Sequence, residues 1–562
     1  MVKKPKYYDS KKCDNIRSML RSSERLFGSR VAFMQKENGA YKDTTYSEYR
    51  DMVEELGTEL YARGYAGSRI IVMGENSLEW TTVYMATVCG LGVIVPVDKE
   101  IPDEELQNIA RLSEARAIFC SPHLKSKADA LGIDTFTFDD IYSLIASGAK
   151  RLKCGERDYL RLPINNDAMA ILIFTSGTTG VSKGVMLSNR NICYTLSEIS
   201  TMIQADCNDR VLSVLPLHHV YEATCGFLFV LSIGGSIAFA EGLRYITRNI
   251  QEVKPTAMFC VPILLETIYH KIWANIKRKG IEKKVRNAIK LTGKNMKLKR
   301  RIFSEIHDSL GGNLRLIISG GAAADPLVIK GMRDLGFLTL QGYGLTECAP
   351  IAAVNKDDFY RDDAAGLATP HSVLDVYDVQ NDGTGEIRVK GDNVMLGYYG
   401  DPELTAKTIR GGWLYTGDLG YIDSDGFLHI TGRKKNVIVT AGRKNVFPEE
   451  LETYLCRSEF VDDAVVVGYV NEAKGDYDIV AVLYPNDAAF VETYGRGYSQ
   501  GQVEAEFSKA VEDTNSLVQD YKRIHFFVTR QEKFDKNSSR KIRRAGVADE
   551  ARAEYLRKLA RR

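Results

Sequence analysis

The chain has 562 residues, of which 44% are hydrophobic and 26% are charged. This length exceeds what one hydrophobic core normally sustains, so we expect a globular protein with several layers or domains. The 75 basic and 73 acidic side chains give a formal charge of +2, which excludes a global attraction to nucleic acid or to an anionic surface.

Cysteine spacing and the chain's apolar segments indicate the expected compartment. Ten cysteines lie scattered without a C-x-x-C pair, which argues against a disulfide framework and a zinc site and predicts reduced, mostly buried thiols. The N-terminus has lysines but no apolar stretch behind them, so we expect no secretory signal and a cytoplasmic protein. The near-apolar run 226–240 is shorter than the roughly 20 residues of a membrane-spanning helix, so we interpret it as core.

Short β-branched runs alternate with helical stretches in the first part of the chain. The runs lie at residues 69–74, 92–98, 170–176, 256–262 and 314–321. This alternation predicts α/β layers with mostly parallel strands. Several runs end in Gly, Ser or Pro, where a strand passes into a loop and where open α/β sheets usually bind ligands.

The pattern of the chain changes toward the C-terminus. After about residue 380, short strands rich in turn residues predominate, and after Arg433 a smaller α+β segment begins. We place the boundary near 432–436, which predicts one domain over residues 1–434 and a second over 435–562.

The stretch FTSGTTGVSKG at 174–184 follows a predicted buried strand. Its Gly, Ser and Thr residues offer backbone N–H groups and hydroxyls, the donors that a polyphosphate needs, and Lys183 adds a positive charge. It is not a Walker A loop, because Ser182 stands where that motif has glycine and Gly184 where it has Ser or Thr. A flexible surface loop without function is the alternative.

This loop resembles the phosphate-binding signature of the adenylate-forming superfamily, which comprises acyl-CoA synthetases, luciferases and nonribosomal adenylation domains. Four further stretches resemble motifs of that superfamily in order and spacing: QGYGLTE at 341–347, YTGD at 415–418, GRKKN at 432–436 and GRKNVFPEELE at 442–452. The similarity covers nearly the whole chain. It implies an α/β fold with a large multi-layer N-terminal α/β domain and a small mobile α+β C-terminal domain.

The resemblance also implies ATP, Mg²⁺ and coenzyme A as cofactors or cosubstrates. The residues that match nucleotide-binding positions are Thr175, Ser176, Gly177, Thr178, Thr179, Gly180, Lys183, Gly320, Gly321, Ala322, Gln341, Gly342, Tyr343, Gly344, Thr346, Asp418, Arg433 and Lys541. Those that match catalytic positions are Lys541, His219, Thr175 and Glu347, and Glu347 and Thr175 match the metal ligands.

Two residues of QGYGLTE also suit these roles chemically. Tyr343 lies between two glycines, which leave its ring free to stack on a flat base, and Glu347 supplies a hard oxygen suited to Mg²⁺. Core packing is the alternative for the tyrosine, and a solvated helix start is the alternative for the glutamate.

Asp418 and Arg433 match the positions that hold the ribose. An aspartate on a turn can accept hydrogen bonds from both ribose hydroxyls, although a plain turn is the alternative. In LPLHHVYE, His219 resembles the family's histidine beside the acyl carboxylate, with His218 as its rival and a structural role as the alternative for each.

The late stretch FDKNSSRKIRR contains the candidate catalytic lysine. Lys541 aligns with the family's lysine and is favoured over Lys536 because K-I-R-R follows it. Arg540 replaces the glycine expected before that lysine, and glycine there often marks a positive φ. Lys435 in GRKKN occupies the position of the family's hinge.

Segments from Phe259 onward resemble the long-chain fatty acyl-CoA synthetase branch, which implies a fatty acid as substrate. The alternatives are a shorter or aryl acid, an acyl carrier protein as acceptor, and a non-catalytic relative that binds lipid or acyl-adenylate. No carrier domain follows residue 562, which we expect to exclude a nonribosomal module.

A basic segment predicts a second partner. Residues 271–301 contain thirteen Lys and Arg against one Glu, with apolar residues interleaved. Such a surface can rest on anionic lipid, which would place the protein peripherally on the inner face of the membrane; a solvated helical face is the alternative.

Overall fold

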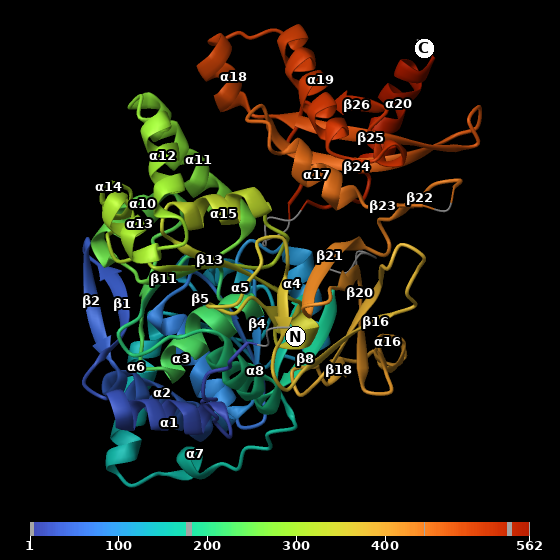
Figure 1. The fold of residues 1–562 in the computed structure, drawn as a ribbon. Coiled ribbons are helices and arrows are strands. Elements are labelled where there is room, and N and C mark those ends of the chain that lie inside the picture. Colours follow the sequence, from blue (N-terminus) through green and yellow to red (C-terminus); the bar gives the residue numbers. More distant parts are fainter. Residues whose placement is uncertain (1–4, 176–181, 443, 537–541, 561–562) are drawn as a thin grey trace. The chain divides into compact units, whose positions relative to one another are not determined.

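The computed structural model describes residues 5–175, 182–442, 444–536 and 542–560 (Figure 1). The chain divides into two compact units. The first comprises Met1–Asp375, Arg388–Tyr415 and Ile422–His429, and the second comprises Val376–Ile387, Thr416–Tyr421 and Ile430–Arg562. The second unit therefore includes two short segments from earlier in the chain. The single cut between residues 434 and 435 stays a prediction.

All five apolar runs predicted as strands are strands, and three of them lie in one sheet of the first unit. This sheet has the order β18-β8-β7-β4-β3-β5-β6. The strands are β3 (Arg69–Met73), β4 (Val93–Val97), β5 (Ala117–Cys120), β6 (Asp134–Thr137), β7 (Met169–Thr175), β8 (Lys183–Ser188) and β18 (Gly397–Tyr398). The pairs from β7 to β6 are parallel, as the sequence predicts, whereas β8 is antiparallel to both of its neighbours.

The other two runs are β11 and β12 of a second sheet in the first unit, ordered β15-β14-β13-β12-β11-β9-β10-β1-β2. The strands are β1 (Val31–Glu37), β2 (Ala40–Thr45), β9 (Arg210–Ser213), β10 (Ser236–Phe239), β11 (Ala257–Cys260), β12 (Leu316–Ser319), β13 (Leu338–Gly344), β14 (Ile351–Val354) and β15 (Gly366–Ala368). From β13 to β1 all neighbours are parallel, so the loops that follow β9, β11, β12 and β13 gather at one edge.

Four strands have residues in both units: β16 (Val373–Tyr377), β17 (Gly385–Lys390), β20 (Trp413–Ile422) and β21 (Phe427–Arg433). A two-residue strand, β19 (Ile409–Arg410), pairs with the start of β20 inside the first unit. The chain therefore passes between the units several times in this region.

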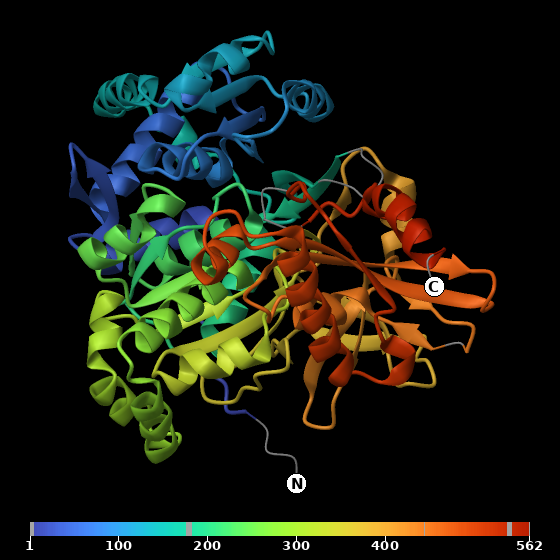
Figure 2. The same cartoon turned by 90° about the horizontal axis from the view of Figure 1, so that it is seen from above.

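Helices of the first unit pack on both sheets (Figures 1 and 2). The α-helices are α1 (Ile16–Phe27), α2 (Tyr46–Ala62), α3 (Leu78–Ala86), α4 (Asp103–Ser113), α5 (Lys125–Asp129), α6 (Asp140–Lys153), α7 (Asp158–Arg161), α8 (Asn189–Met202), α9 (Phe229–Ser232), α10 (Ile246–Val253), α11 (Pro262–Arg278), α12 (Glu282–Thr292), α13 (Met296–Ile302), α14 (Ser304–Ser309), α15 (Pro326–Asp334) and α16 (Pro402–Thr408). Five shorter turns are η1 (Thr87–Leu91), η2 (Pro122–Leu124), η3 (Glu222–Leu228), η4 (Leu243–Tyr245) and η5 (Thr346–Cys348), of which η1 and η3 are π-helical.

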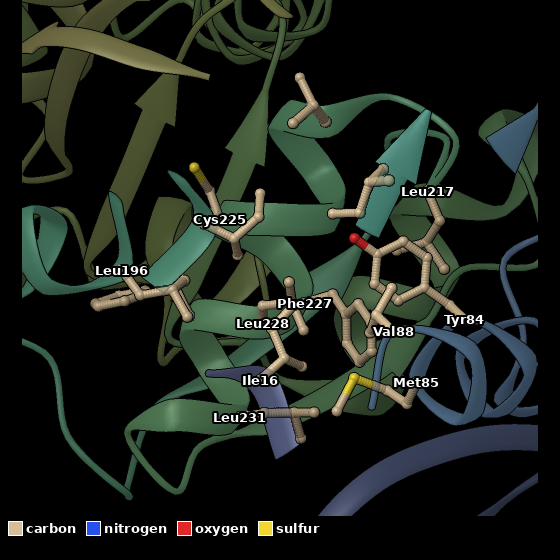
Figure 3. Close-up of a cluster of buried hydrophobic side chains, with 14 of the residues drawn as sticks. Ile16, Tyr84, Met85, Val88, Leu196, Leu217, Cys225, Phe227, Leu228 and Leu231 are labelled. Atoms are coloured by element: carbon tan, nitrogen blue, oxygen red, sulfur yellow. The ribbon is translucent and has the colours of Figure 1, made fainter. Parts of the chain in front are cut away.

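Figure 3 shows part of the largest core, where side chains of α1, α3, α8 and η3 meet. Tyr84 and Phe227 pack edge to face there, with ring centroids 5.9 Å apart. The apolar run 226–240 contributes Phe227, Leu228 and Leu231, all of which are buried, so its interpretation as core is confirmed. Among the described residues, no helix is both long enough and apolar enough to cross a bilayer.

The second unit contains a three-stranded sheet with helices on both faces (Figure 1). Its strands are β22 (Ile438–Val439), β23 (Asn445–Val446), β24 (Val461–Asn471), β25 (Asp476–Pro485) and β26 (Phe526–Thr529), of which the last three form the sheet; its helices are α17 (Pro448–Leu455), α18 (Asp487–Tyr494), α19 (Gln500–Ser516), η6 (Asp520–Lys522) and α20 (Val547–Leu559). Side chains alternate along β24: Val466 faces the core with α17 and α19, and Val465 faces the core with α20.

Candidate active site

Strands β7 and β8 hold the predicted phosphate-binding loop between them. They form an antiparallel pair in which Thr175 lies opposite Lys183. The predicted loop residues Ser176, Gly177, Thr178, Thr179 and Gly180 lie outside the described residues. Because β7 continues the parallel sheet through β4, the described ends of the loop lie at the carboxyl edge of that sheet, where α/β sheets bind ligands.

One tyrosine ring joins the loop to the predicted metal ligand. The Lys183 ammonium lies 5.7 Å from the centroid of the Tyr398 ring, and the Tyr398 hydroxyl donates a 2.8 Å hydrogen bond to Oε1 of Glu347. Tyr398 is held by β18, which pairs with β8, and the amide of Met395 donates to the Glu347 carbonyl. The structure thus brings together Lys183 and Glu347, which lie far apart in the sequence. Tyr398 was missed, since nothing in its sequence neighbourhood marks it.

The oxygens of Glu347 and Thr175 fit a magnesium ion that binds together with a nucleotide. The described residues include no cluster of three or more His, Cys, Asp or Glu that could hold a metal alone. Glu347 is half-buried, and Thr175 ends β7 beside the loop, so each can offer an oxygen, the ligand type Mg²⁺ prefers. Mg²⁺ is usually bound by one or two protein oxygens together with substrate phosphates. The two oxygen ligands Glu347 and Thr175 therefore suit a Mg²⁺ ion that also binds the phosphates.

The segments after β12 and in β13 lie side by side. Ser319 pairs with Gln341, and the Gln341 side chain accepts a 2.8 Å hydrogen bond from the amide of Ala324. The structure therefore brings the segment with the predicted residues Gly320, Gly321 and Ala322 next to Gln341. The predicted residues Gly342, Tyr343 and Gly344 follow Gln341 along β13, and Thr346 begins η5.

Two of these positions have no room for a side chain. At Gly344 an added Cβ would lie 1.8 Å from the carbonyl oxygen of Pro350, because β13 and β14 approach closely there. At Gly320 a Cβ would lie 2.9 Å from the Tyr221 ring, whose hydroxyl donates to the carbonyl of Ile318. A close backbone at Gly344 and a close tyrosine ring at Gly320 thus explain both glycines without requiring a nucleotide.

The two candidate histidines lie on the turn that precedes η3. Their rings are 4.2 Å apart, and Nε2 of His218 lies 3.9 Å from Oδ2 of Asp98. Burial, followed by the charges of His219 and Lys99, holds the pKa of His218 well below its usual value, so this imidazole is neutral. The amide of Leu217 donates to the Asn76 side chain, which fixes the turn. Both histidines stay candidates for the acyl carboxylate.

Glu222, three residues beyond His219, was not singled out from the sequence. Its side chain is 1% exposed, and Ser213 donates a 2.6 Å hydrogen bond to Oε1. Burial raises the pKa of Glu222 to about 8, so the carboxyl group is mainly protonated at neutral pH. Gly226 makes space for it one π-helical turn later. No sequence signal distinguishes such a buried glutamate from an exposed one.

In the second unit, the two predicted ribose ligands form an ion pair. Nε of Arg433 lies 2.7 Å from Oδ1 of Asp418, and the Asp418 amide donates to the Thr416 hydroxyl. The Asp418 residue is only 5% exposed. Neighbouring Lys434 forms a 2.9 Å ion pair with Glu386. Asp418 therefore lies within strand β20 and not on the predicted turn, and its ion pair ties this strand to Arg433 at the end of β21.

Lys435, the predicted hinge, lies between β21 and β22, within the turn that is closed by the hydrogen bond from the Asn436 amide to the Arg433 carbonyl. Lys541, the predicted catalytic lysine, and Arg540 lie outside the described residues. Lys536, the other candidate for the catalytic lysine, forms a 2.7 Å ion pair with Asp463. The roles of Lys435 and Lys541 stay predictions.

Comparison with known proteins identifies the class. Residues 20–399 match the family model of the AMP-binding enzymes, which covers well over half of the chain. The chain therefore belongs to the AMP-binding enzymes of the adenylate-forming superfamily.

Individual relatives and a solved structure agree with this assignment. A long-chain-fatty-acid–CoA ligase of Mycobacterium bovis is 28% identical over 489 residues, covering 81% of this chain and 80% of its own. Human long-chain-fatty-acid–CoA ligase 1 is 27% identical over 503 residues, covering 80% and 71%. The structure of o-succinylbenzoate CoA synthetase from Bacillus subtilis in complex with its acyl-adenylate intermediate is similar with a TM-score of 0.74 at 20% identity, over 94% of this chain and 97% of that one. This likeness confirms the predicted α/β fold with a large multi-sheet part and a small α+β part.

Proposed function

We propose that the protein activates a fatty acid with ATP and transfers the acyl group to the thiol of coenzyme A. The observation that carries this proposal is the meeting of Lys183, Tyr398 and Glu347 at the described ends of the predicted phosphate-binding loop. A fatty acid as substrate and coenzyme A as acceptor are supported by the relatives named long-chain-fatty-acid–CoA ligases, at 27% and 28% identity.

In the first half-reaction, a carboxylate oxygen of the fatty acid attacks the α-phosphorus of ATP, and the bond to pyrophosphate breaks. Negative charge builds up on the phosphoryl oxygens and on the leaving group, so cations at the phosphates lower the barrier. We assign this work to the loop amides, Lys183 and Lys541. Mg²⁺, when bound through Glu347 and Thr175, would neutralise further phosphate charge.

In the second half-reaction, the thiol of coenzyme A attacks the acyl carbonyl of the acyl-adenylate and expels AMP, which leaves a thioester. Asp418 and Arg433 would hold the ribose through both steps. Lys435 would allow the small C-terminal domain to change orientation between the two steps. This mobility is part of the proposal.

Three alternatives differ in acid, acceptor or catalysis. A shorter or aryl acid and a carrier-protein thiol each keep the first half-reaction. A non-catalytic relative that binds lipid or acyl-adenylate would lack it, a reading motivated by Arg540 in place of glycine.

Pyrophosphate release across a fatty-acid series, with and without coenzyme A, tests the proposal. We expect release that depends on a fatty acid, thioester only when coenzyme A is present, and no acyl-adenylate from the Lys541→Ala variant. Release with aryl acids alone, or thioester only on a carrier protein, would favour an alternative; no release with any acid would favour the non-catalytic relative.

We also propose that the basic segment 271–301 contacts anionic lipid, where a fatty acid is found. On α13 the exposed side includes Lys297 and Arg301 together with Leu298 and Ile302, which are 40% and 47% exposed. At the end of α12, Leu291 is 86% exposed. Apolar side chains among basic ones are typical of helices that lie in a membrane interface, whereas a merely solvated face has no need of them.

Sedimentation with vesicles tests this contact. The protein should bind vesicles that contain phosphatidylserine at low salt and dissociate at high salt, because screening shortens the reach of such charges. The Leu298→Ser and Ile302→Ser double variant should bind more weakly at the same salt. Binding that ignores lipid charge and salt would exclude the contact.

A further inference from the structure

The described residues on either side of segment 537–541 are fixed to one another. Lys536 and Ile542 form an antiparallel bridge, and the Arg543 amide donates a 2.7 Å hydrogen bond to the Asp535 carbonyl. These four described residues, 535–536 and 542–543, therefore form a small antiparallel pair, which we call the base. Lys541, to which the proposed function gives the adenylation step, immediately precedes this base.

Both sides of the base are also tied to the outer strand of the C-terminal sheet. In the sheet order β24-β25-β26, one edge of β24 has no strand partner among the residues that the structure describes. Lys536 forms its 2.7 Å ion pair with Asp463 of β24, whose side chain is 11% exposed. On the other side, Arg544 reaches the same strand at Val466, three residues further along. One strand thus serves as the platform for both sides of the base.

An ion pair between Arg544 and Glu452 contacts the backbone of Val466 at the edge of the strand. Arg544 donates to both carboxylate oxygens of Glu452, a residue of α17. The Val466 amide donates a 2.7 Å hydrogen bond to Oε1 of Glu452, and its carbonyl accepts from Arg544 at 3.4 Å. The pair therefore satisfies the two backbone groups that an edge strand leaves open at this residue. Loss of either partner would release both the strand edge and the segment after residue 541.

Helix α17 links this pair to the turn that contains the predicted hinge. Nδ2 of Asn436 donates a 2.6 Å hydrogen bond to Oε1 of Glu449, and Arg544 lies 3.8 Å from the same carboxylate oxygen. Asn436, Val466 and Arg544 also line a cavity of about 280 Å³. Arg544 thus has the carboxylates of Glu452 and Glu449 on one side and the cavity on the other. The direction of its side chain therefore depends on Glu452.

We propose that Glu452 is a positioning residue for the adenylation half-reaction, acting through Arg544 on the base that carries Lys541. The inference rests on the proposed function. Its physical reason is that a catalytic cation must stay within a fraction of an ångström of its working place, since a misplacement of about 1 Å costs on the order of 100-fold in rate. In the second half-reaction, which does not use Lys541, the same tether has no such effect.

The chain offers a matched control on the same helix. Glu450 of α17 forms a 2.6 Å ion pair with Lys522 and is linked to none of the residues 535–544 by a described contact. Glu452→Gln and Glu450→Gln therefore each remove one charged partner from α17, but only the first changes the contact with Arg544.

The experiment measures the two half-reactions separately in the full chain. Pyrophosphate release reports adenylation, and acyl-CoA formed from supplied acyl-adenylate reports thioester formation. For Glu452→Gln we expect kcat for adenylation to fall by about 100-fold with little change in KM for ATP, and thioester formation to stay within about twofold, the margin of a variant without specific effect. Glu450→Gln should resemble the parent in both. Arg544→Lys, which keeps the charge but not the two-point contact, should lie between.

The pH profile adds a readout that a merely structural role would not move. Burial raises the pKa of Glu452 to about 7, against the lowering effect of Arg544 and with a smaller raising effect of Glu449. Adenylation by the parent and by Glu450→Gln should decline as Glu452 becomes protonated below about pH 7, and this limb should be missing from the Glu452→Gln profile.

Each outcome decides. Loss of adenylation with thioester formation retained supports the inference, as does the missing limb. Equal loss of both half-reactions, or adenylation at the parent's level, overturns it; if Glu452→Gln does not fold, the same criteria apply to Arg544→Lys. A parent that releases no pyrophosphate, or a Lys541→Ala variant that still does, would instead contradict the proposed function.

Discussion

The ion pair between Asp418 and Arg433 allows the ribose assignment to be tested by one substitution, Asp418→Ala. The carboxylate is buried and lies 2.7 Å from the guanidinium, so it is held in place before any ligand arrives. Hydrogen bonds that involve a charged group contribute about 1.5–3 kcal/mol to binding. Their loss in Asp418→Ala should therefore raise the Kd for ATP by roughly 10- to 150-fold. The side chain of Arg433 is 43% exposed and can be solvated when its partner is lost, so we expect the fold to persist.

Calorimetric titration with ATP measures this change, and thermal unfolding checks the fold. Asp375→Ala is the matched control, because Asp375 forms an ion pair with Arg388 but belongs to none of the predicted motifs. The parent should bind ATP analogues that lack a ribose hydroxyl more weakly than it binds ATP. The Asp418→Ala variant should bind these analogues and ATP with the same affinity. Equal Kd values for ATP in the variant and the parent would remove Asp418 from the site.

Three further changes probe other parts of the molecule. Gly344→Ala should lower the melting temperature strongly or prevent folding, because its Cβ would overlap the Pro350 carbonyl. Gly501→Ala in a helix should not, because its Cβ would make only an ordinary contact with the Ser499 hydroxyl at 3.8 Å; equal melting temperatures would contradict the close approach. Burial raises the pKa of Glu222 from 4.5 to about 8, so the folded state holds a proton that the unfolded state releases between these values. The free energy of unfolding should therefore fall by about 1 kcal/mol per pH unit over that range, and urea unfolding of Glu222→Gln should show no such slope; an unchanged slope would assign it to another group. Lys435→Pro should slow thioester formation from supplied acyl-adenylate and spare pyrophosphate release, since a fixed φ obstructs backbone rotation; slowing of pyrophosphate release alone would contradict the hinge.

Local sequence pattern was sufficient to predict five strands of the first unit, β3, β4, β7, β11 and β12. The runs at 69–74 and 314–321 became β3 and β12 because uninterrupted apolar β-branched residues suit strands buried on both faces. The Gly, Ser and Thr residues after Phe174 predict the end of a strand, and β7 ends at Thr175. These features depend on neighbours in the chain, so they can be read from it.

The missed features depend on distant partners. Tyr398 matters because β18 pairs with β8, which places its ring between Lys183 and Glu347. Glu222 resembles any polar residue in the sequence, yet the π-helical turn places it against Ser213 inside the protein. Tertiary pairing determined both positions, and no local propensity encodes it.

The cysteines have a practical consequence. All ten lie in the described part of the chain, where none forms a disulfide; Cys154 and Cys456 are exposed, and Cys13 and Cys207 are partly exposed. Cys154 belongs to the first unit and Cys456 to the second. Maleimide dyes should therefore react first at the one fully exposed thiol of each unit, without engineered cysteines. Energy transfer between a donor and an acceptor dye would then report, in single molecules, whether the separation of the two units changes when ATP, a fatty acid or coenzyme A is added.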